Sequence, residues 1–139
     1  MNVFSDTIRI TTTLKTEDIN ITDMVESVIF ESNIKEGSAT VFTGHTTAGI
    51  HLNNNDPDLA EDLHGLLNEL VSNKKKGFKH NKGDYGRNAD AHIKSVLVGN
   101  GVTIPVMNNK LALGQWQGIY LSEFDGPRNR VIVVRVIGK

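Results

Sequence analysis

Histidine is the side chain through which this sequence offers most to a metal ion, because the chain has five histidines and no cysteine. Without thiolates, imidazole is the remaining ligand for borderline metal ions such as zinc. His45 lies among small residues in segment 43–49, where glycines let a ligand approach the backbone. His80 lies in a basic segment, and His92 lies in the first turn of a predicted helix, where the dipole favours the neutral ring. We predict that His45, His80 and His92 share one metal site.

The spacing of these histidines matches no local metal motif, so the site depends on the fold to bring the rings together. Three protein ligands with a fourth position open is the arrangement of a catalytic zinc site. The predicted cofactor is a divalent metal, zinc in the first place, with magnesium or manganese as alternatives. If they are not ligands, His45 or His80 is expected to act as general base. His51 and His64 are expected to be hydrogen-bonded or interfacial residues.

A second group of reactive side chains lies near the end of the sequence. Glu123 and Asp125 stand at i and i+2, which directs both carboxylates to one side of a strand end, and Arg128 follows across a turn. An arginine fork binds phosphate or carboxylate through two parallel hydrogen bonds. One interpretation is a divalent cation on Glu123 or Asp125, with its anion held by Arg128. The alternative is a turn in which Asp125 caps the backbone and Arg128 only pairs with it.

These groups define the predicted site. The catalytic candidates are His45, Glu123 and Asp125. The candidate contacts to substrate or anion are Arg128, Thr46, Trp116 and Gln117. Free N–H groups at the start of the helix that carries His92 are expected to add donors for an anion.

A basic segment raises the alternative of nucleic-acid binding. Five lysines alternate there with Phe78 and Tyr85, and positive charge beside stacking rings is how single strands are held. The lysines are Lys74, Lys75, Lys76, Lys79 and Lys82. The whole chain has 15 Lys and Arg against 16 Asp and Glu, so no domain-wide basic field supports that interpretation. A solvated loop is the simpler explanation.

The length and composition of the chain limit its number of domains, its fold and its location. At 139 residues the chain is expected to form a single compact domain, 1–139, and it is too short for a TIM barrel of roughly 250 residues. The first residues show no basic segment followed by an apolar one, so we expect no signal peptide. The longest aliphatic run, 131–134, is far shorter than the roughly 20 residues of a membrane helix. We expect a soluble, cytoplasmic protein.

Apolar periodicity predicts the elements that position the site. We predict strands over 7–14, 38–44, 47–53, 102–106, 110–124 and 131–137 and helices over 22–36, 57–71 and 89–98. Asn20 or Thr22 is the expected cap of the first helix, which Gly37 stops, and Asp56 caps the second with Pro57 in its first position. The first helix is expected to bury Met24, Val25, Val28 and Ile29, and the third Ala89, Ile93, Val96 and Leu97.

The last forty residues are predicted to be β-structure. Asn108 and Asn109 are typical of a type I′ hairpin turn. Strand 131–137 is apolar on nearly both faces, which places it in a sheet interior or against a partner subunit. Tight turns between strands, with helices inserted, favour an α+β fold: a mainly antiparallel β-sheet or sandwich with about three helices.

Six ordered blocks of residues resemble the YjbQ-like family of small uncharacterised proteins, described as a secondary thiamine-phosphate synthase family. The blocks cover nearly the whole chain: Gly44-His45-Thr46-Thr47-Ala48-Gly49, Asn53 to Pro57, Phe78-Lys79-His80, Ala91-His92-Ile93-Lys94, Leu113-Gly114-Gln115-Trp116-Gln117 and Glu123-Phe124-Asp125-Gly126-Pro127-Arg128. The sequence departs from the family at Asn54, where the family has Glu, and at Phe78, where it commonly has Tyr.

The resemblance implies an α+β subunit, a homotrimer, and a pocket near the subunit boundaries where motif histidines hold a metal or an anion. It also implies a weak synthase activity that joins a pyrimidine methyl diphosphate to a thiazole phosphate. In that reaction Arg128 and a metal would stabilise the leaving pyrophosphate, while Trp116 or Phe78 would stack on the pyrimidine. The leading expectation is therefore a protein that binds a phosphorylated small molecule beside a histidine-held metal. The alternatives are a non-catalytic trimeric metal- or metabolite-binding module and, less favoured, a nucleic-acid-associated protein acting through Lys74–Lys82.

Overall fold

The computed structural model describes residues 1–72 and 77–139 of the chain. The strands are β1 (Asn2–Thr11), β2 (Glu17–Asn20), β3 (Glu36–Thr43), β4 (Ala48–Asn54), β5 (Gly101–Met107), β6 (Lys110–Leu111), β7 (Gln117–Glu123) and β8 (Asn129–Gly138). The helices are α1 (Thr22–Ser32), α2 (Pro57–Leu70) and α3 (Ala89–Val98), with the short 3-10 helix η1 (Lys79–Lys82) before α3. The predicted α+β class, with three α-helices in one compact domain, is confirmed.

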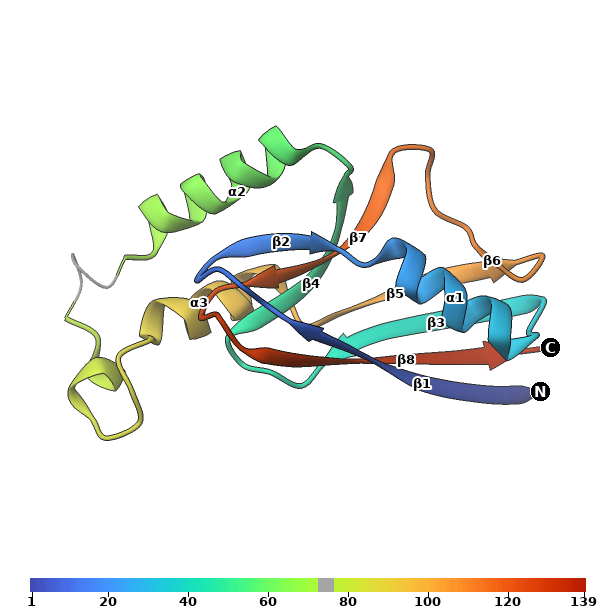
Figure 1. The fold of residues 1–139 in the computed structure, drawn as a ribbon, viewed down its shortest axis with the longest axis horizontal. Coiled ribbons are helices and arrows are strands. Elements are labelled where there is room, and N and C mark those ends of the chain that lie inside the picture. Colours follow the sequence, from blue (N-terminus) through green and yellow to red (C-terminus); the bar gives the residue numbers. More distant parts are fainter. Residues whose placement is uncertain (73–76) are drawn as a thin grey trace.

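The strands form two antiparallel sheets (Figure 1). The larger sheet has the order β1-β8-β3-β5-β6, and the smaller has the order β2-β7-β4. Between the sheets and α1 lies the main core, which includes Val25 and Ile29 of α1, Val134 of β8 and Leu121 of β7, all without solvent exposure. A smaller cluster of Leu67, Ala91 and Phe124 joins α2, α3 and the end of β7.

The β-strand predictions were right for β3, β4, β5 and β8 and wrong at the start of the chain and over 110–124. The first strand runs from 2 to 11 rather than from 7 to 14, and β2 was missed because it has only four residues. The turn at Asn108 and Asn109 has φ values of 53° and 60°, as a type I′ hairpin requires. Predicted strand 110–124 is two strands in different sheets, because the chain turns at Gly114, whose N–H donates to Gln117 Oε1.

Strand β8 lies in the interior of the larger sheet, one of its two expected places, but it is buried on one face only. Ile132, Val134 and Val136 face the core, whereas Val133 and Ile137 are 37% and 38% exposed on the other side. The prediction of burial on both faces was therefore wrong within this subunit. An aliphatic side chain was taken as evidence of burial, although folded proteins leave many such side chains at their surface.

Helix α1 begins after a cap different from the expected one. Ile21 occupies the N-cap without a side-chain hydrogen bond, while Asn20 Oδ1 accepts from the N–H of Thr22 at 3.0 Å. The helix ends at Asn33, which has a left-handed φ of 56°, before Gly37 is reached. Met24, expected on the buried face, is 46% exposed.

Helix α2 begins as predicted, with Asp56 Oδ1 accepting from the N–H groups of Asp58 and Leu59 and with Pro57 in the first position. Its apolar face is less covered than expected. Leu67 is its one fully buried residue, and Leu66 and Leu70 are 54% and 60% exposed.

Helix α3 presents a face different from the predicted one. Ala91 and Ser95 are buried, whereas Val96 and Leu97 are 82% and 58% exposed. The reason is close approach: Ser95 Oγ donates to the carbonyl of Ala48 in β4 at 2.6 Å, which requires small residues on the contact face. The neighbouring corner is equally tight, since a Cβ on Gly49 would lie 2.8 Å from the carbonyl oxygen of Gly99. Within the described residues, no helix has the length and apolar character needed to cross a membrane.

Candidate functional site

Three separate segments meet at one end of the two sheets: the β3–β4 connection, the start of α3, and the β7–β8 turn. Between them lies an open, polar pocket of about 560 Å³. Its lining residues are His45, Thr46, Thr47, Tyr85, Asn88, His92, Pro127, Arg128, Asn129 and Arg130. Four residues of the predicted site, His45, Thr46, His92 and Arg128, are thus brought together by the fold.

His45 is held by the backbone of β8. Its Nε2 accepts a hydrogen bond from the N–H of Val131 at 3.0 Å, so the neutral ring carries its proton on Nδ1. Burial, followed by the positive charge of Arg130, lowers the pKa of His45 below its ordinary value, and the opposing effect of Glu123 is smaller. The ring is therefore a neutral donor and acceptor near pH 7.

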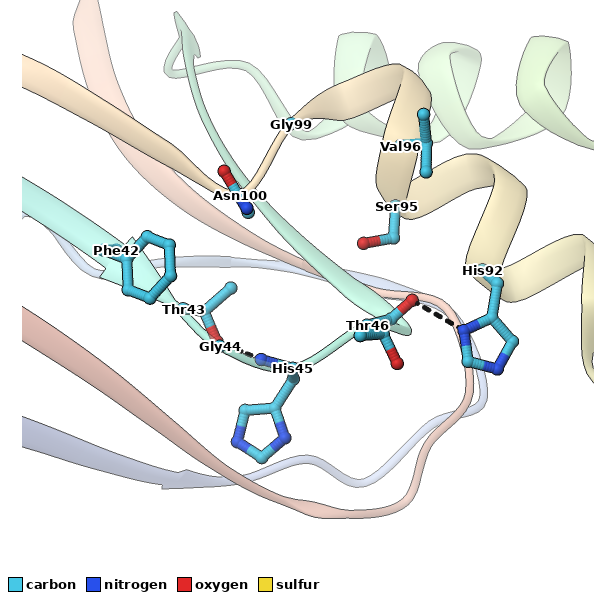
Figure 2. A pocket seen from close by; sticks show the side chains of 10 residues that line it. All are labelled: Phe42, Thr43, Gly44, His45, Thr46, His92, Ser95, Val96, Gly99 and Asn100. Carbon is cyan, nitrogen blue, oxygen red and sulfur yellow. Dashed lines mark hydrogen bonds between the residues drawn. The ribbon is translucent and has the colours of Figure 1, made fainter. Parts of the chain in front are cut away.

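His92 is tied to the β3–β4 connection. Its Nδ1 lies 3.0 Å from the carbonyl oxygen of Thr46, which can only accept, so Nδ1 is the donor (Figure 2). The neutral ring then keeps a lone pair on Nε2. Figure 2 shows His45, Thr46 and His92 following one another along the same wall, with Phe42 and Val96 on different sides of the space above them.

Asn88 connects His80 to the β7–β8 turn. Its Nδ2 donates to Asp125 Oδ2 at 2.8 Å, which leaves Oδ1 to accept from His80 Nε2 at 2.9 Å. Arg128 binds the same carboxylate: Nη2 donates to Asp125 Oδ2 and Nε to the Asp125 carbonyl, both at 2.9 Å. A continuous chain of hydrogen bonds thus runs from His80 through Asn88 and Asp125 to Arg128, and it includes the expected pairing of Arg128 with Asp125.

Glu123, expected as a catalytic carboxylate, is buried away from the pocket. Its oxygens accept from Nε and Nη2 of Arg130, from Thr12 Oγ1 at 2.8 Å, and from the N–H groups of Phe124 and Asp125 at 2.9 Å. Burial alone would raise its pKa, but the hydrogen bonds, that from Arg130 above all, outweigh this effect and lower it. Glu123 therefore carries a charge that holds Arg130 and has no access to substrate.

Trp116 and Gln117, expected as substrate contacts, lie at the opposite end of β7. Gln117 pairs with Asn54 and Glu123 pairs with Ala48, so the length of β7 separates them, about 20 Å at a rise of about 3.4 Å per residue. Trp116 is 70% exposed, and the Gln117 carboxamide is bonded to Gly114. Neither side chain lines the polar pocket within a single subunit, because β7 separates two motifs that are neighbours in sequence, so their role as substrate contacts stays a prediction.

Two of the three predicted metal ligands lie together. The ring centroids of His80 and His92 are 4.9 Å apart at an interplanar angle of 77°. Each ring has one nitrogen held by an oxygen acceptor, which is how metal-binding histidines are oriented, and the other nitrogen remains for a ligand. Among residues 1–72 and 77–139, however, no three His, Asp or Glu side chains form a group that could hold a metal ion. His45 does not complete a three-histidine site in this subunit.

The start of α3 was expected to offer free N–H groups to an anion. The N–H of Ala89 instead donates to Asn81 Oδ1 at 3.0 Å, so at least this donor is already used.

Phe78, expected to stack on a substrate ring, lines a separate cavity of about 320 Å³ with His80, His92 and Ile93. Of the basic segment, Lys74, Lys75 and Lys76 lie outside the described residues, so the nucleic-acid alternative remains a prediction.

His51 and His64 are hydrogen-bonded, as expected, in a second polar cluster. His64 Nε2 lies 2.7 Å from Asp18 Oδ1, and Ser122 Oγ donates to the same oxygen at 2.6 Å. His51 Nδ1 lies 3.2 Å from Ser122 Oγ. The cluster joins β2, β4, β7 and α2, and Ser122 is completely buried, so no substrate reaches its hydroxyl.

Two important residues of the site were not predicted. Arg130 alternates in β8 with the same period as the core residues Ile132 and Val134, so it lies on the buried face of the strand. An arginine on a buried face needs a buried partner, and this signal was present in the sequence. Asn88 stands at the N-cap of α3, where its side chain makes no capping hydrogen bond. Its role between His80 and Asp125 depends on three segments meeting, which no local pattern reveals.

The comparisons with known proteins give one answer. Residues 6–139 match the family model described as UPF0047 protein YjbQ-like. A UPF0047 protein of Methanocaldococcus jannaschii is 44% identical over 131 residues, covering 94% of this chain and 91% of that protein. YugU of Bacillus subtilis, a UPF0047 protein, is 41% identical over 133 residues, covering 95% of this chain and 98% of that protein.

Solved structures agree. A YbjQ-like protein of unknown function from Sulfolobus solfataricus aligns with a TM-score of 0.94 at 37% identity over 99% of both chains. An uncharacterised conserved protein of the YjbQ/UPF0047 family from Clostridium acetobutylicum aligns with a TM-score of 0.88 at 40% identity, over 95% of this chain and 99% of that one. The resemblance of the six motif blocks is thereby confirmed, and the chain belongs to the YjbQ-like UPF0047 family.

Proposed function

We propose that this protein binds a phosphorylated small molecule in the polar pocket at the end of the two sheets. The observation that carries the proposal is the convergence of His45, His92 and Arg128 on that pocket from three segments of the chain. Each of the three is held in place by a hydrogen bond to the backbone, so the donors are oriented before a ligand arrives.

Arg128 is the principal anion contact in this proposal. Its side chain is 53% exposed, and its bonds to Asp125 use Nε and Nη2, so among the described residues Nη1 is left for a ligand. Arg130 also lines the pocket, but its charge is already balanced by Glu123. An anion would therefore be bound by the guanidinium of Arg128 and by the Nδ1–H of His45, beside the buried Arg130–Glu123 pair.

A divalent metal is part of the proposal, as a ligand shared by His80 and His92. Zinc is the first candidate, with magnesium or manganese as alternatives, and its remaining ligands would be solvent or the bound phosphate. When bound, the metal would add positive charge beside the phosphate oxygens. Calorimetric titration of the wild-type protein with zinc, magnesium and manganese tests this part separately from anion binding.

The reaction proposed for the site is diphosphate departure in a weak, secondary thiamine-phosphate synthase activity. Arg128 would hold the departing diphosphate, and His45, whose lowered pKa keeps the ring neutral near pH 7, would be placed to exchange a proton. If the pocket binds phosphate compounds without any turnover, the protein is instead a non-catalytic binding module.

A homotrimer is proposed as the assembly of this protein. Apolar side chains left exposed on α2 and α3 support it, and light scattering of the purified protein tests it.

The decisive experiment compares inorganic pyrophosphate binding by the wild type, Arg128→Ala and Arg135→Ala. Arg135 is an exposed arginine of β8 that does not line the pocket, so it controls for the loss of a positive charge. We expect Arg128→Ala to weaken binding by at least about ten-fold, which is the loss of a charged hydrogen bond, and Arg135→Ala to leave it unchanged. Equal affinities in all three proteins would overturn the proposed anion site.

A further inference from the structure

A second cavity of about 420 Å³ adjoins the polar pocket and shares three of its residues, His45, Thr46 and His92. It lies between β3, the β3–β4 connection and the end of α3 (Figure 2). Its full lining is Phe42, Thr43, Gly44, His45, Thr46, His92, Ser95, Val96, Gly99 and Asn100. Because these three residues line both cavities, we call them the ridge.

The second cavity has the opposite chemical character from the first. Its lining includes no Asp, Glu, Lys or Arg, and it includes the exposed apolar side chains of Phe42 and Val96, 41% and 82% accessible. The lining of the polar pocket, by contrast, includes two arginines, two asparagines and two histidines.

Several polar groups in the wall of the second cavity are already used by the protein itself. Ser95 Oγ donates to the carbonyl of Ala48 at 2.6 Å, and Thr43 Oγ1 donates to the carbonyl of Val131 at 3.1 Å. The carbonyl of Gly99 accepts from the N–H of Ile50 at 3.0 Å. A polar ligand group entering this cavity would give up hydrogen bonds to water and find few replacements, whereas an apolar group would lose nothing.

We propose that the ligand is a phosphate ester or diphosphate ester of an apolar alcohol, with its phosphate in the polar pocket and its aromatic or aliphatic group in the second cavity. This inference rests on the proposed function, because it takes the phosphate position from it. The ligand crosses the ridge of His45, Thr46 and His92, so the ester linkage lies beside two imidazole rings. The continuity of the two cavities through the shared ridge favours one ligand over two independent sites.

The experiment measures dissociation constants for inorganic phosphate, glycerol phosphate and phenyl phosphate by calorimetry. Phenyl phosphate and glycerol phosphate carry the same phosphate and differ in the group that would occupy the second cavity. We expect phenyl phosphate to bind about ten-fold more tightly than glycerol phosphate, the gain for burying a ring-sized apolar group. Equal affinity of the two esters overturns this inference and leaves the proposed function standing. If none of the three ligands binds, the proposed function itself fails.

Two neighbouring positions of α3 provide matched variants. Val96 lines the second cavity and Leu97 does not, while both are exposed, so Val96→Asn and Leu97→Asn replace an accessible apolar side chain by the same amide. We expect Val96→Asn to abolish most of the preference for phenyl phosphate without changing the affinity for inorganic phosphate. Leu97→Asn should preserve the preference.

Phe42→Ala gives a second, independent variant on the other wall and should also reduce the preference. A preference that survives in both Val96→Asn and Phe42→Ala overturns the inference. A second result would also overturn the inference: Val96→Asn keeps the ester preference but loses oligomer mass in light scattering. The cavity would then be covered by a second copy of the chain.

Discussion

His92 Nδ1 donates to the carbonyl oxygen of Thr46 at 3.0 Å, and this bond joins α3 to the connection between β3 and β4. The two residues are 46 positions apart in the sequence. The bond fixes the tautomer of His92 and leaves Nε2 for a ligand, so a single contact couples the position of the helix to the chemistry of the ring.

The position of this ring makes the metal proposal testable. His92→Ala removes one of two proposed ligands and should reduce zinc affinity by at least about ten-fold, as expected when a direct metal ligand is lost. His64→Gln is the matched control, because His64, on α2, binds Asp18 of β2 and lies outside the pocket. Calorimetric titration with zinc measures both. The same zinc affinity in wild type and His92→Ala would remove the histidine site from the proposal.

Glu123 provides a prediction about stability. Glu123→Gln removes the charge that balances Arg130, whose side chain is 2% exposed, and leaves a buried guanidinium without its counter-ion. We expect a loss of about 3–5 kcal/mol in the free energy of unfolding, measured by urea denaturation. Glu36→Gln, at an exposed position, should change it by less than about 0.5 kcal/mol. A Glu123→Gln protein of normal stability that had lost only turnover would restore Glu123 as a catalytic candidate.

The pH dependence of stability should report on the cluster around His51. Burial lowers the pKa of His51 from 6.5, and His64 adds to the lowering, while Asp18 opposes it. The folded state therefore binds a proton at His51 less readily than the unfolded chain does. Stability is full above pH 6.5 and falls as the pH drops from 6.5 through the lower folded pKa.

The measurement is a series of urea denaturations between pH 7.5 and about pH 5, and His45, whose pKa is also lowered, contributes in the same direction. His51→Gln should flatten the slope, because the ring that resists protonation is gone. A slope identical to that of the wild type would show that His51 titrates alike in both states.

Two glycines give a paired prediction about the corner that supports the site. In Gly49→Ala the new Cβ would lie 2.8 Å from the carbonyl oxygen of Gly99 and equally close to Val98, so α3 and its following turn must shift. We expect a loss of about 1–3 kcal/mol in unfolding free energy, as for other overpacked positions, together with weaker ligand binding.

Gly65→Ala is the control for this change. Its Cβ would meet nothing within 4 Å, and the position is inside α2, where alanine favours the helix. We expect a gain of about 0.5–1 kcal/mol and unchanged binding. Thermal and urea unfolding of both variants compare the two directly, and a Gly49→Ala protein at least as stable as the wild type would contradict the tight packing of this corner.

Local signals predicted the elements whose ends are set by a side chain or a turn. Asp56 and Pro57 fixed the start of α2, and Asn108 with Asn109 fixed the β5–β6 hairpin, because each acts through contacts within a few residues. The buried faces of the helices were predicted less well. The side of α3 that packs on β4 is chosen by the small residues Ala91 and Ser95, not by the largest apolar ones, since the partner backbone is close.

The site followed the same rule. His45, His92 and Arg128 were predicted from the chemistry of their side chains, and the fold brings them to one pocket. Glu123 and Trp116 were misplaced, because their neighbours in space are determined by a buried arginine and by the length of β7. The position of Arg130 among the core residues of β8 was a signal for the first, but its pairing with Glu123 and the run of β7 away from the pocket depend on how the strands pack, which motif spacing does not contain.

The hydrogen-bonded chain from Arg128 through Asp125 and Asn88 to His80 has a consequence beyond the pocket. A ligand that draws the guanidinium away from Asp125 changes the carboxylate that orients the Asn88 amide, and that amide in turn holds the imidazole in η1. Occupancy of the pocket would thereby change the contacts that hold η1, so a ligand at the β7–β8 turn would also alter the segment that carries Lys79 and Lys82.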